Sequence, residues 1–501
     1  MQTPFDELQN LLGQVQDLNA AAAVLEWDQE TYMPDGASEA RGHQVATLRK
    51  LAHEFFTDDE VGRLLDTLEP ETADLDPLST EAALVRVTRR DYEKALKIPA
   101  SLVAEMARAV ARGKQAWRQA RETNTFATFA PHLERLIDLN IQKAEALGYE
   151  DRIYDALLDQ YEEGMKTATV EAVFEDLRTR LVPLVQAIAG CARPDDRFIH
   201  QSFETQKQWD FGLEVINDFG YDLNRGRQDL SAHPFTTSFS ITDVRLTTRL
   251  DEHFFPMALF GTMHECGHGL YEQGIDLSLD RTPLADGTSL GMHESQSRLW
   301  ENLIGRSRAF WQHYYPRFQA LFPTPLAGVS LDAFYRAINK VEPSLIRVEA
   351  DEVTYNLHIM LRFELEQAMV EGRVSVDELP ALWNDKMEEY LGLRPETDAQ
   401  GVLQDIHWSL GAIGYFSTYA LGNLMSVQLF DRAKHDIPDL EDQIATGRFA
   451  DLLEWLRVHI HRYGRKLQAT ELLENVTGTG LHAAPWLAYI REKYGAIYGA
   501  W

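Results

Sequence analysis

Apolar residues recur along most of the chain at the three- and four-residue spacing of one face of an α-helix. The first such stretch runs from Leu8 to Trp27, with leucine or valine at positions 8, 11, 12, 15 and 18, and Pro34 and Gly36 interrupt it. Further amphipathic stretches of the same kind lie at 45–56, 84–96, 102–121, 129–147, 170–188, 355–370 and 452–463. This pattern predicts a mainly α-helical protein.

One segment departs from the helical pattern. Residues 235–248, FTTSFSITDVRLTT, follow Pro234 and are rich in Thr, Ser, Val and Ile. Such residues favour extended backbone, so the segment predicts one or two strands, placed directly before a helical stretch at 254–274. The strands could form a purely structural hairpin, or an exposed strand edge could hold a peptide by main-chain hydrogen bonds.

The charge of the chain limits its partners. Its 501 residues include 78 Asp and Glu against 48 Lys and Arg, which gives a formal net charge of −30. Nucleic acid and anionic membranes would be repelled at long range, so neither is an expected partner. No apolar run approaches the roughly 18 residues of a membrane span, and the N-terminus lacks the regions of a signal peptide. The presence of only two cysteines, Cys191 and Cys266, favours a reducing compartment, and we expect a cytoplasmic protein.

The strongest chemical signal is the H-E-x-x-H array of His264, Glu265 and His268. Residues four apart lie on one face of a helix, so both imidazoles can reach one metal ion at about 2 Å. Glu265 projects one step around the helix, where it can act on a water at the metal. Two solvated histidines on an ordinary helix could give the same pattern. The apolar residues on both sides of the array argue against that alternative and favour a zinc site.

A catalytic zinc ion needs a third protein ligand and an open position. The segment 291–298, GMHESQSR, offers Glu294, which lies 26 residues after His268 with loop-forming residues between them. His293 is the rival, but adjacent residues on a helix point about 100° apart, so only one of the two can bind directly. Cys266 lies on the opposite side of the first helix and is interpreted as a packing residue. Glu294 is therefore the predicted third ligand.

Two further segments carry polar groups in apolar surroundings. IRVEAD, at 346–351, places Arg347 before several acids, and a guanidinium held by carboxylates is prepared to bind another carboxylate through two donors. GVLQDIHW, at 401–408, contains Gln404, Asp405 and His407 before an aromatic, Gly-rich stretch. Each segment alone is also compatible with a structural ion-pair network.

Together these motifs resemble the Taq-type, or M32, family of zinc metallocarboxypeptidases. The resemblance rests on HECGH and HESQS, on His233-Pro234-Phe235, on DVRLT at 243–247, on IRVEAD and on GVLQDIHW. WDQETYMPDGA, which begins at Trp27, also looks like that family. The matches run from about residue 24 to residue 423 in the family's order, and no motif position departs from the pattern.

The resemblance implies a single metallocarboxypeptidase domain over residues 1–501. Its fold would be the neurolysin-like helical fold, in which two lobes flank a deep groove and a small sheet lies next to the zinc-site helix. The resemblance also implies a cytosolic homodimer that removes C-terminal residues from peptides with broad specificity and disfavours Pro at or next to the cleaved bond. The cofactor would be one Zn²⁺ per chain, with Co²⁺ or another divalent ion as the alternative.

Roles for individual residues follow from the same resemblance. His264, His268 and Glu294 would be the ligands, and Glu265 would be the general base. Arg347 would hold the terminal carboxylate of the substrate. Arg245 and the segment with Gln404, Asp405 and His407 would line the closed end of the groove. His233, Tyr415 and Tyr419 complete the predicted substrate-binding set. Among these, His407, Tyr415 and Tyr419 are the candidate donors to the oxyanion, and the sequence does not choose among them.

Two other functions compete with this interpretation. An endo-acting oligopeptidase would use the same zinc site and groove, and only the carboxylate clamp separates it from a carboxypeptidase. A non-catalytic peptide-binding or chaperone-like protein would use a degenerate version of the fold. The presence of Glu265 together with all three ligands argues against that second alternative.

Overall fold

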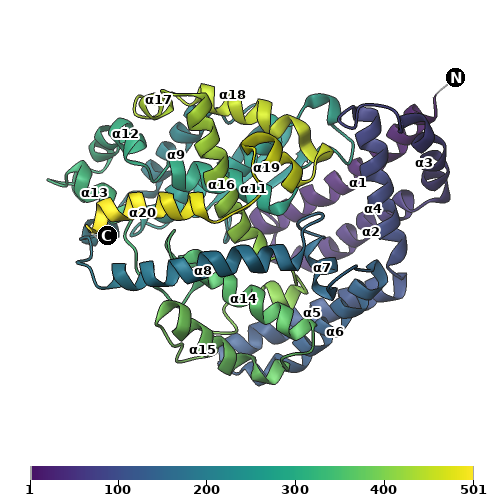
Figure 1. Cartoon of the computed structure of the whole chain (residues 1–501), viewed down its shortest axis with the longest axis horizontal. Coiled ribbons are helices and arrows are strands. Elements are labelled where there is room, and N and C mark those ends of the chain that lie inside the picture. Colours follow the sequence, from purple (N-terminus) through teal and green to yellow (C-terminus); the bar gives the residue numbers. More distant parts are fainter. Residues whose placement is uncertain (1–2, 500–501) are drawn as a thin grey trace.

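Helices make up most of the protein, as the apolar spacing predicts. The computed structural model describes residues 3–499. The four N-terminal helices gather at one end of the molecule (Figure 1), and they are α1 (Pro4–Thr31), α2 (Ser38–Phe56), α3 (Asp59–Thr72) and α4 (Thr80–Lys97). The next five are α5 (Ala100–Thr123), α6 (Ala130–Leu147), α7 (Ile153–Leu158), α8 (Thr167–Ala189) and α9 (Thr205–Phe219).

The remaining helices follow the sheet. They are α10 (Phe255–Gly274), α11 (Leu290–Arg298), α12 (Arg308–Leu321), α13 (Leu331–Ile338), α14 (Tyr355–Val370), α15 (Leu379–Leu391), α16 (Ser417–Asp436), α17 (Leu440–Ile444), α18 (Ala450–His459), α19 (Ala469–Thr477) and α20 (Ala484–Tyr498). The expected helix at 452–463 is too long at its C-terminal end. The helix ends at His459, where Ile460 leaves the helical conformation (φ −130°, ψ −64°), and a 3₁₀ segment follows at 461–466. Within that segment Gly464 adopts φ 50° and approaches the carbonyl of Leu284 too closely for a Cβ atom.

A three-stranded sheet lies immediately before α10. Its strands are β1 (Gly226–Leu230), β2 (Thr236–Ser240) and β3 (Asp243–Thr248), in the spatial order β1-β3-β2. β1 runs parallel to β3 and β2 runs antiparallel to it, so β2 is an edge strand. The composition of 235–248 predicts β2 and β3 correctly. It does not predict β1, whose sequence GRQDL contains no β-branched or aromatic residue.

Three helices at the centre approach one another unusually closely. A Cβ atom on Gly267 of α10 would lie 2.6 Å from the carbonyl oxygen of Gln296 in α11. A Cβ atom on Gly422 of α16 would lie 2.6 Å from Cβ of Glu294, also in α11. α11 therefore lies between two helices that contact it at Gly267 and Gly422, where there is no room for a side chain larger than the hydrogen atom of glycine. It continues directly into a π-helical turn, Leu299–Ile304.

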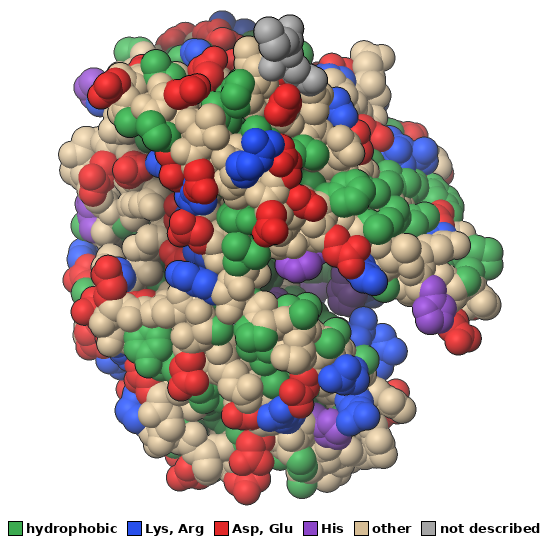
Figure 2. Space-filling model, turned by 90° about the vertical axis from the view of Figure 1, so that its right-hand side faces the viewer, with side chains coloured by type: hydrophobic (Ala, Val, Ile, Leu, Met, Phe, Trp, Pro, Cys, Tyr) green, Lys and Arg blue, Asp and Glu red, His purple; other side chains and the backbone are tan. Residues whose placement is uncertain are grey.

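A cavity of about 850 Å³ opens beside these elements. Residues of α1, β2, α10, α11, α16 and the loop 280–286 line it. The face viewed in Figure 2 is hollowed, and histidine side chains are visible inside the hollow. The expected mainly helical fold, with a small sheet beside the helix that carries the H-E-x-x-H array, is thus confirmed. Within residues 3–499, every helix is too short or too polar to cross a membrane.

Candidate active site

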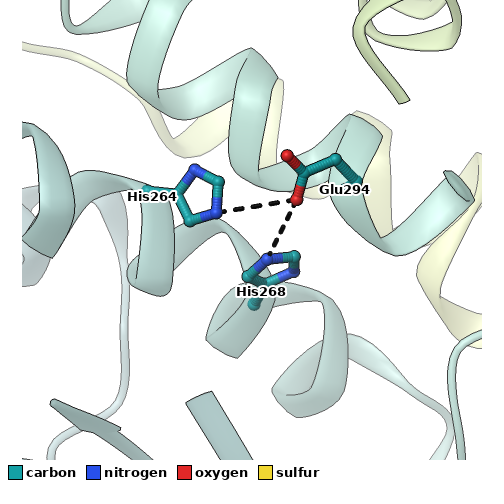
Figure 3. Close-up of side chains that lie close together, drawn as sticks. All are labelled: His264, His268 and Glu294. Carbon is teal, nitrogen blue, oxygen red and sulfur yellow. Dashed lines mark ion pairs between the residues drawn. The ribbon is translucent and has the colours of Figure 1, made fainter. Parts of the chain in front are cut away.

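The two histidines of α10 and the glutamate of α11 converge at the wall of the cavity (Figure 3). The ligand atoms of His264, His268 and Glu294 all lie within 4.8 Å of one another. Oε2 of Glu294 is 3.6 Å from Nε2 of His264 and 3.5 Å from Nε2 of His268. The fold therefore brings together the three donors that the sequence predicts, from two helices separated by a loop.

These separations fit a metal ion better than they fit direct hydrogen bonds. Four ligands at about 2.1 Å in tetrahedral geometry lie roughly 3.4 Å from one another. The observed nitrogen-to-oxygen distances are close to that value and longer than an ordinary hydrogen bond. Burial also lowers the pKa of His268 to about 3, so its imidazole is neutral at pH 7 and can offer a lone pair. The donor set fits a divalent cation of the zinc type.

Glu265 is buried next to this cluster, and it also lines the cavity. Its Oε2 accepts a hydrogen bond of 2.7 Å from the hydroxyl of Thr236, on the edge strand β2. Burial raises the pKa of Glu265, although nearby His264 and the Thr236 hydroxyl oppose the shift. A carboxylate made more basic in this way is better suited to take a proton.

A second layer of charged residues holds His264 and Glu294. Nδ1 of His264 lies 2.9 Å from Oε2 of Glu301, in the π-helical turn. Arg298 donates to Oε1 of Glu294 at 2.6 Å and to Oε2 of Glu301 at 3.2 Å. Burial alone would raise the pKa of Glu301, but Arg298 and His264 lower it to about 2. Burial likewise opposes the charge of Glu294, but Arg298 and His264 hold the pKa of Glu294 well below its ordinary value. Both carboxylates are therefore ionised at neutral pH.

Arg347 lies in a buried network and does not line the cavity. Its Nε and Nη2 donate to Oδ1 of Asp405 at 2.9 and 2.8 Å, and its Nη1 donates to the hydroxyl of Tyr355 at 2.9 Å. The other oxygen of Asp405 accepts from Arg362 at 2.7 Å. Gln404 completes the network by accepting from the backbone N–H of Arg347 at 2.8 Å. These contacts unite the segments IRVEAD and GVLQDIHW in one network.

Neither Arg245 nor His233 lines the cavity. The guanidinium of Arg245 forms two hydrogen bonds of 2.9 Å with Asp243. It also lies between two rings, with its central carbon 4.4 Å from the centroid of Trp27 and 4.8 Å from that of Phe239. His233 is exposed, and its carbonyl accepts a hydrogen bond from Ser231.

The three candidate oxyanion donors lie together. Tyr415 and Tyr419 line the cavity, with their ring centroids 5.3 Å apart. Nε2 of His407 is 3.3 Å from the hydroxyl of Tyr419. Burial lowers the pKa of His407 to about 4, so it is neutral at pH 7. The two tyrosines thus belong to the cavity wall, whereas His407 contacts the hydroxyl of Tyr419 but does not itself line the cavity.

Several residues of the site could not be identified from the sequence. Thr236 contacts Glu265, Arg298 contacts Glu294, Glu301 contacts His264 and Glu272 contacts His293, yet the sequence assigned none of these four residues a role at the site. Glu301 offered the clearest missed signal, because it lies seven residues after Glu294 and thus near the same helical face. Arg298 also lies one helical turn after Glu294, whereas Thr236 contacts the site from a separate element that only the folded chain brings there.

Comparison with known proteins gives a consistent result over the whole chain. A sequence model of the carboxypeptidase Taq (M32) metallopeptidases matches residues 7–494. The chain is 43% identical to Thermostable carboxypeptidase 1 of Thermus thermophilus, in an alignment that covers 99% of this chain and 100% of that relative. It is 39% identical to Carboxypeptidase 1 of Bacillus subtilis, with 98% of each chain covered.

Solved structures agree with these relatives. The crystal structure of an M32 carboxypeptidase from Deinococcus radiodurans R1 has a TM-score of 0.97 and 44% sequence identity to this chain, and the match covers 99% of this chain and 100% of that one. The resemblance first seen in the motifs is therefore confirmed. This chain belongs to the carboxypeptidase Taq (M32) family of metallopeptidases.

Proposed function

We propose that this protein is a zinc-dependent carboxypeptidase that removes C-terminal residues from peptides with broad specificity, with Glu265 as the general base. One observation carries the proposal: His264, His268 and Glu294 place their donor atoms within 4.8 Å of one another, beside the buried carboxylate of Glu265. The N, N and O donor set favours zinc among the common divalent ions.

The proposed chemistry is hydrolysis by an activated water. A zinc ion held by the three ligands would polarise the scissile carbonyl and lower the pKa of a water molecule. Glu265 takes a proton from the attacking water and then donates it to the leaving amine. Thr236 keeps the Glu265 carboxylate in one orientation while this happens. Tyr415 and Tyr419 are the proposed hydrogen-bond donors to the developing oxyanion, since both hydroxyl-bearing rings line the cavity.

A carboxypeptidase must also bind the free carboxylate of its substrate, and we propose Arg347 for that task, with Arg245 as the alternative. Three of the five N–H groups of the Arg347 guanidinium are engaged by Asp405 and Tyr355. Its central carbon lies 5.1 Å from the ring centroid of Tyr419, a cavity residue, so a movement of Tyr419 would give a substrate access to it. Charge-assisted bonds are worth about 1.5 to 3 kcal/mol, so Arg347→Ala should lower kcat/KM by roughly ten- to a hundred-fold.

The test compares a peptide with a free C-terminus and the same peptide with an amidated C-terminus. The wild type should release free amino acids from the acid far faster than from the amide, and a chelator should stop the release until zinc is restored. Equal cleavage of acid and amide would favour the endo-acting oligopeptidase. No cleavage of either peptide by the zinc-loaded protein would favour the non-catalytic peptide-binding alternative.

The role of Glu265 has its own test. Glu265→Gln should retain zinc and bind peptide, but lose at least about 10² in kcat, which is the lower limit for a proton-transfer group. Near-normal turnover by this variant would place the base elsewhere.

We also propose that the protein forms a homodimer, on the basis of the family resemblance. Light scattering should give twice the mass of one 57.1 kDa chain. A mass of 57.1 kDa in solution would contradict the dimer without affecting the proposed chemistry.

A further inference from the structure

His268 differs from His264 in what contacts its second ring nitrogen. We infer that Glu272 and His293 form a relay that orients His268 for the metal, so that both are positioning residues and neither is a ligand. The inference rests on the metal site of the proposed function. The sequence leaves His293 as the rival of Glu294 for the third ligand position. The inference gives His293 a different role.

The relay consists of two short contacts in series. Nδ1 of His268 lies 2.7 Å from Nδ1 of His293, and Nε2 of His293 lies 2.7 Å from Oε1 of Glu272. His268 and Glu272 are on α10, and His293 is on α11. The relay therefore crosses between the two helices that carry the three ligands.

The position of each proton follows from the chemistry of a neutral imidazole, which has one N–H and one lone pair. His268 directs Nε2 toward Glu294, so this nitrogen must keep its lone pair for a metal and the proton must be on Nδ1. That N–H donates to Nδ1 of His293, whose own proton must then be on Nε2. The second N–H donates to Glu272. One carboxylate thus fixes two rings in sequence.

His293 is held too firmly to turn toward the metal. Its ring centroid is 4.9 Å from that of Tyr271, and a Cβ atom on Gly287 would lie 2.5 Å from its Cδ2. Both of its nitrogens already have partners. It also lies outside the group of donor atoms that could share one ion.

A carboxylate therefore orients each of the two histidines, directly for His264 and through a second imidazole for His268. His264 contacts a carboxylate directly, at Glu301, whereas a second imidazole separates His268 from Glu272. Metal-ligating histidines commonly donate their second N–H to such a partner, and loss of the partner typically weakens metal binding about 10- to 100-fold. We expect a loss in that range when either member of the relay is removed.

The experiment measures the zinc dissociation constant of the full-length protein by competition with a chromophoric chelator, independently of activity. Glu272→Gln keeps the shape of the side chain and removes its charge, and His293→Leu removes both hydrogen bonds while keeping bulk. Each should weaken zinc binding about 10- to 100-fold, and the double variant should be no weaker than the more affected single variant, since the two residues act in one chain. His264→Ala provides the benchmark for loss of a true ligand.

His461→Leu is the matched control. His461 is a fully buried histidine that also packs on Tyr271, at 5.1 Å between ring centroids, but its Nε2 contacts Gln296 and not a metal ligand. The zinc affinity of this variant should equal that of the wild type. The melting temperatures of the apo forms identify any variant that fails to fold. If His293→Leu fails to fold, the zinc affinity of the isosteric variant Glu272→Gln still tests the inference.

Three results would overturn the inference. Wild-type zinc affinity in Glu272→Gln would show that the carboxylate has no orienting role. A loss in His293→Leu as large as that in His264→Ala would make His293 a ligand. Retention of tight zinc binding by His264→Ala would instead show that the proposed metal site itself is wrong, which separates the failure of the proposed function from the failure of the relay.

Discussion

At the scale of single residues, the hydroxyl of Thr236 has the most direct influence on a reacting group. It donates to Oε2 of Glu265 from the edge strand, and it is also 2.9 Å from the carbonyl oxygen of the same residue. The contact orients the carboxylate and leaves its other oxygen for water. Because the threonine and the glutamate belong to different elements, the packing of β2 on α10 determines the orientation of the proposed general base.

Replacing this hydroxyl should reduce turnover without reducing binding. We expect Thr236→Val to lower kcat by roughly 10- to 100-fold, as for loss of a hydrogen bond to a charged group, with KM and zinc affinity unchanged. Thr236→Ser, which retains the hydroxyl, is the control and should remain close to the wild type. In a Glu265→Gln background the Thr236→Val change should have little further effect. Normal turnover by Thr236→Val would contradict the orienting role.

Two buried carboxyls outside the metal cluster predict a pH dependence of stability. Burial raises the pKa of Glu162 and of Glu366 from 4.5 to about 7, despite hydrogen bonds to both groups. Below about pH 4.5 both groups are protonated in the folded and unfolded chain, and their contribution to stability is fully present. As pH rises toward 7 the unfolded chain releases these protons first, so the free energy of unfolding falls.

The uncharged variant Glu366→Gln should lose this dependence for one of the two groups. Between about pH 5 and 7.5 its melting temperature should fall less than that of the wild type, and the difference should correspond to at most about 3 kcal/mol. Glu145→Gln, at an exposed position of α6, is the control and should follow the wild type. Parallel pH profiles for wild type and Glu366→Gln would show that Glu366 titrates normally.

At the scale of elements, the position of Glu294, the proposed third ligand, depends on the packing of α11 between α10 and α16. Gly267 and Gly422 allow the helix backbones to approach, and α11 carries Glu294 at their contact. The sequence predicted a helical stretch at 254–274 and a second helix carrying Glu294, and the four-residue spacing of His264 and His268 predicted that they share a face. It could not predict Gly422, because nothing local to residue 422 shows which helix will lie against it.

Gly422→Ala should therefore damage the site from outside it. The new methyl group would lie 2.6 Å from Cβ and Cγ of Glu294, so α11 must shift. We expect a loss of about 1 to 3 kcal/mol in the free energy of unfolding, as for overpacking, together with weaker zinc binding.

Gly42→Ala is the matched control for this substitution. Gly42 is also helical, but a methyl group added there would meet no other atom within 4 Å, so the change should be neutral or stabilising. Unchanged zinc affinity in Gly422→Ala would show that the close approach of α16 does not position Glu294.

At the scale of the whole molecule, local sequence patterns predicted the elements better than the contacts between them. The mainly helical fold, the paired strands and the convergence of His264, His268 and Glu294 follow from spacing and order along the chain. Most partners of those residues do not: Thr236 and Glu301 reach Glu265 and His264 only through packing between elements. Arg298 is the exception, because it lies four residues after Glu294 on the same helix. Arg347 illustrates the same limit. The sequence pointed to the acids that directly follow Arg347 as its partners, but its guanidinium donates to Asp405 and Tyr355. Of those acids, Asp351 accepts from backbone N–H groups and Glu352 accepts from Lys493.

The net charge of −30 should influence which peptides reach the cavity. Long-range repulsion disfavours acidic peptides and attraction favours basic ones, and salt screens both over about 10 Å at 0.1 M. Raising the ionic strength should therefore increase kcat/KM for an acidic peptide and decrease it for a basic one. A neutral peptide of equal length is the control and should change little. The same salt dependence for all three peptides would mean that net charge does not affect encounter.

The close packing of α11 between α10 and α16 has a consequence for the exchange of the proposed zinc ion. Because α10 and α16 pack closely against α11 from both sides, Glu294 should face His264 and His268 whether or not a cation is bound. Loss of the ion then requires no rearrangement of the chain, and its return requires none either. The time needed to reload a stripped enzyme would be set by diffusion through the open side of the cavity and by the release of water from the ion, with no slow step of refolding.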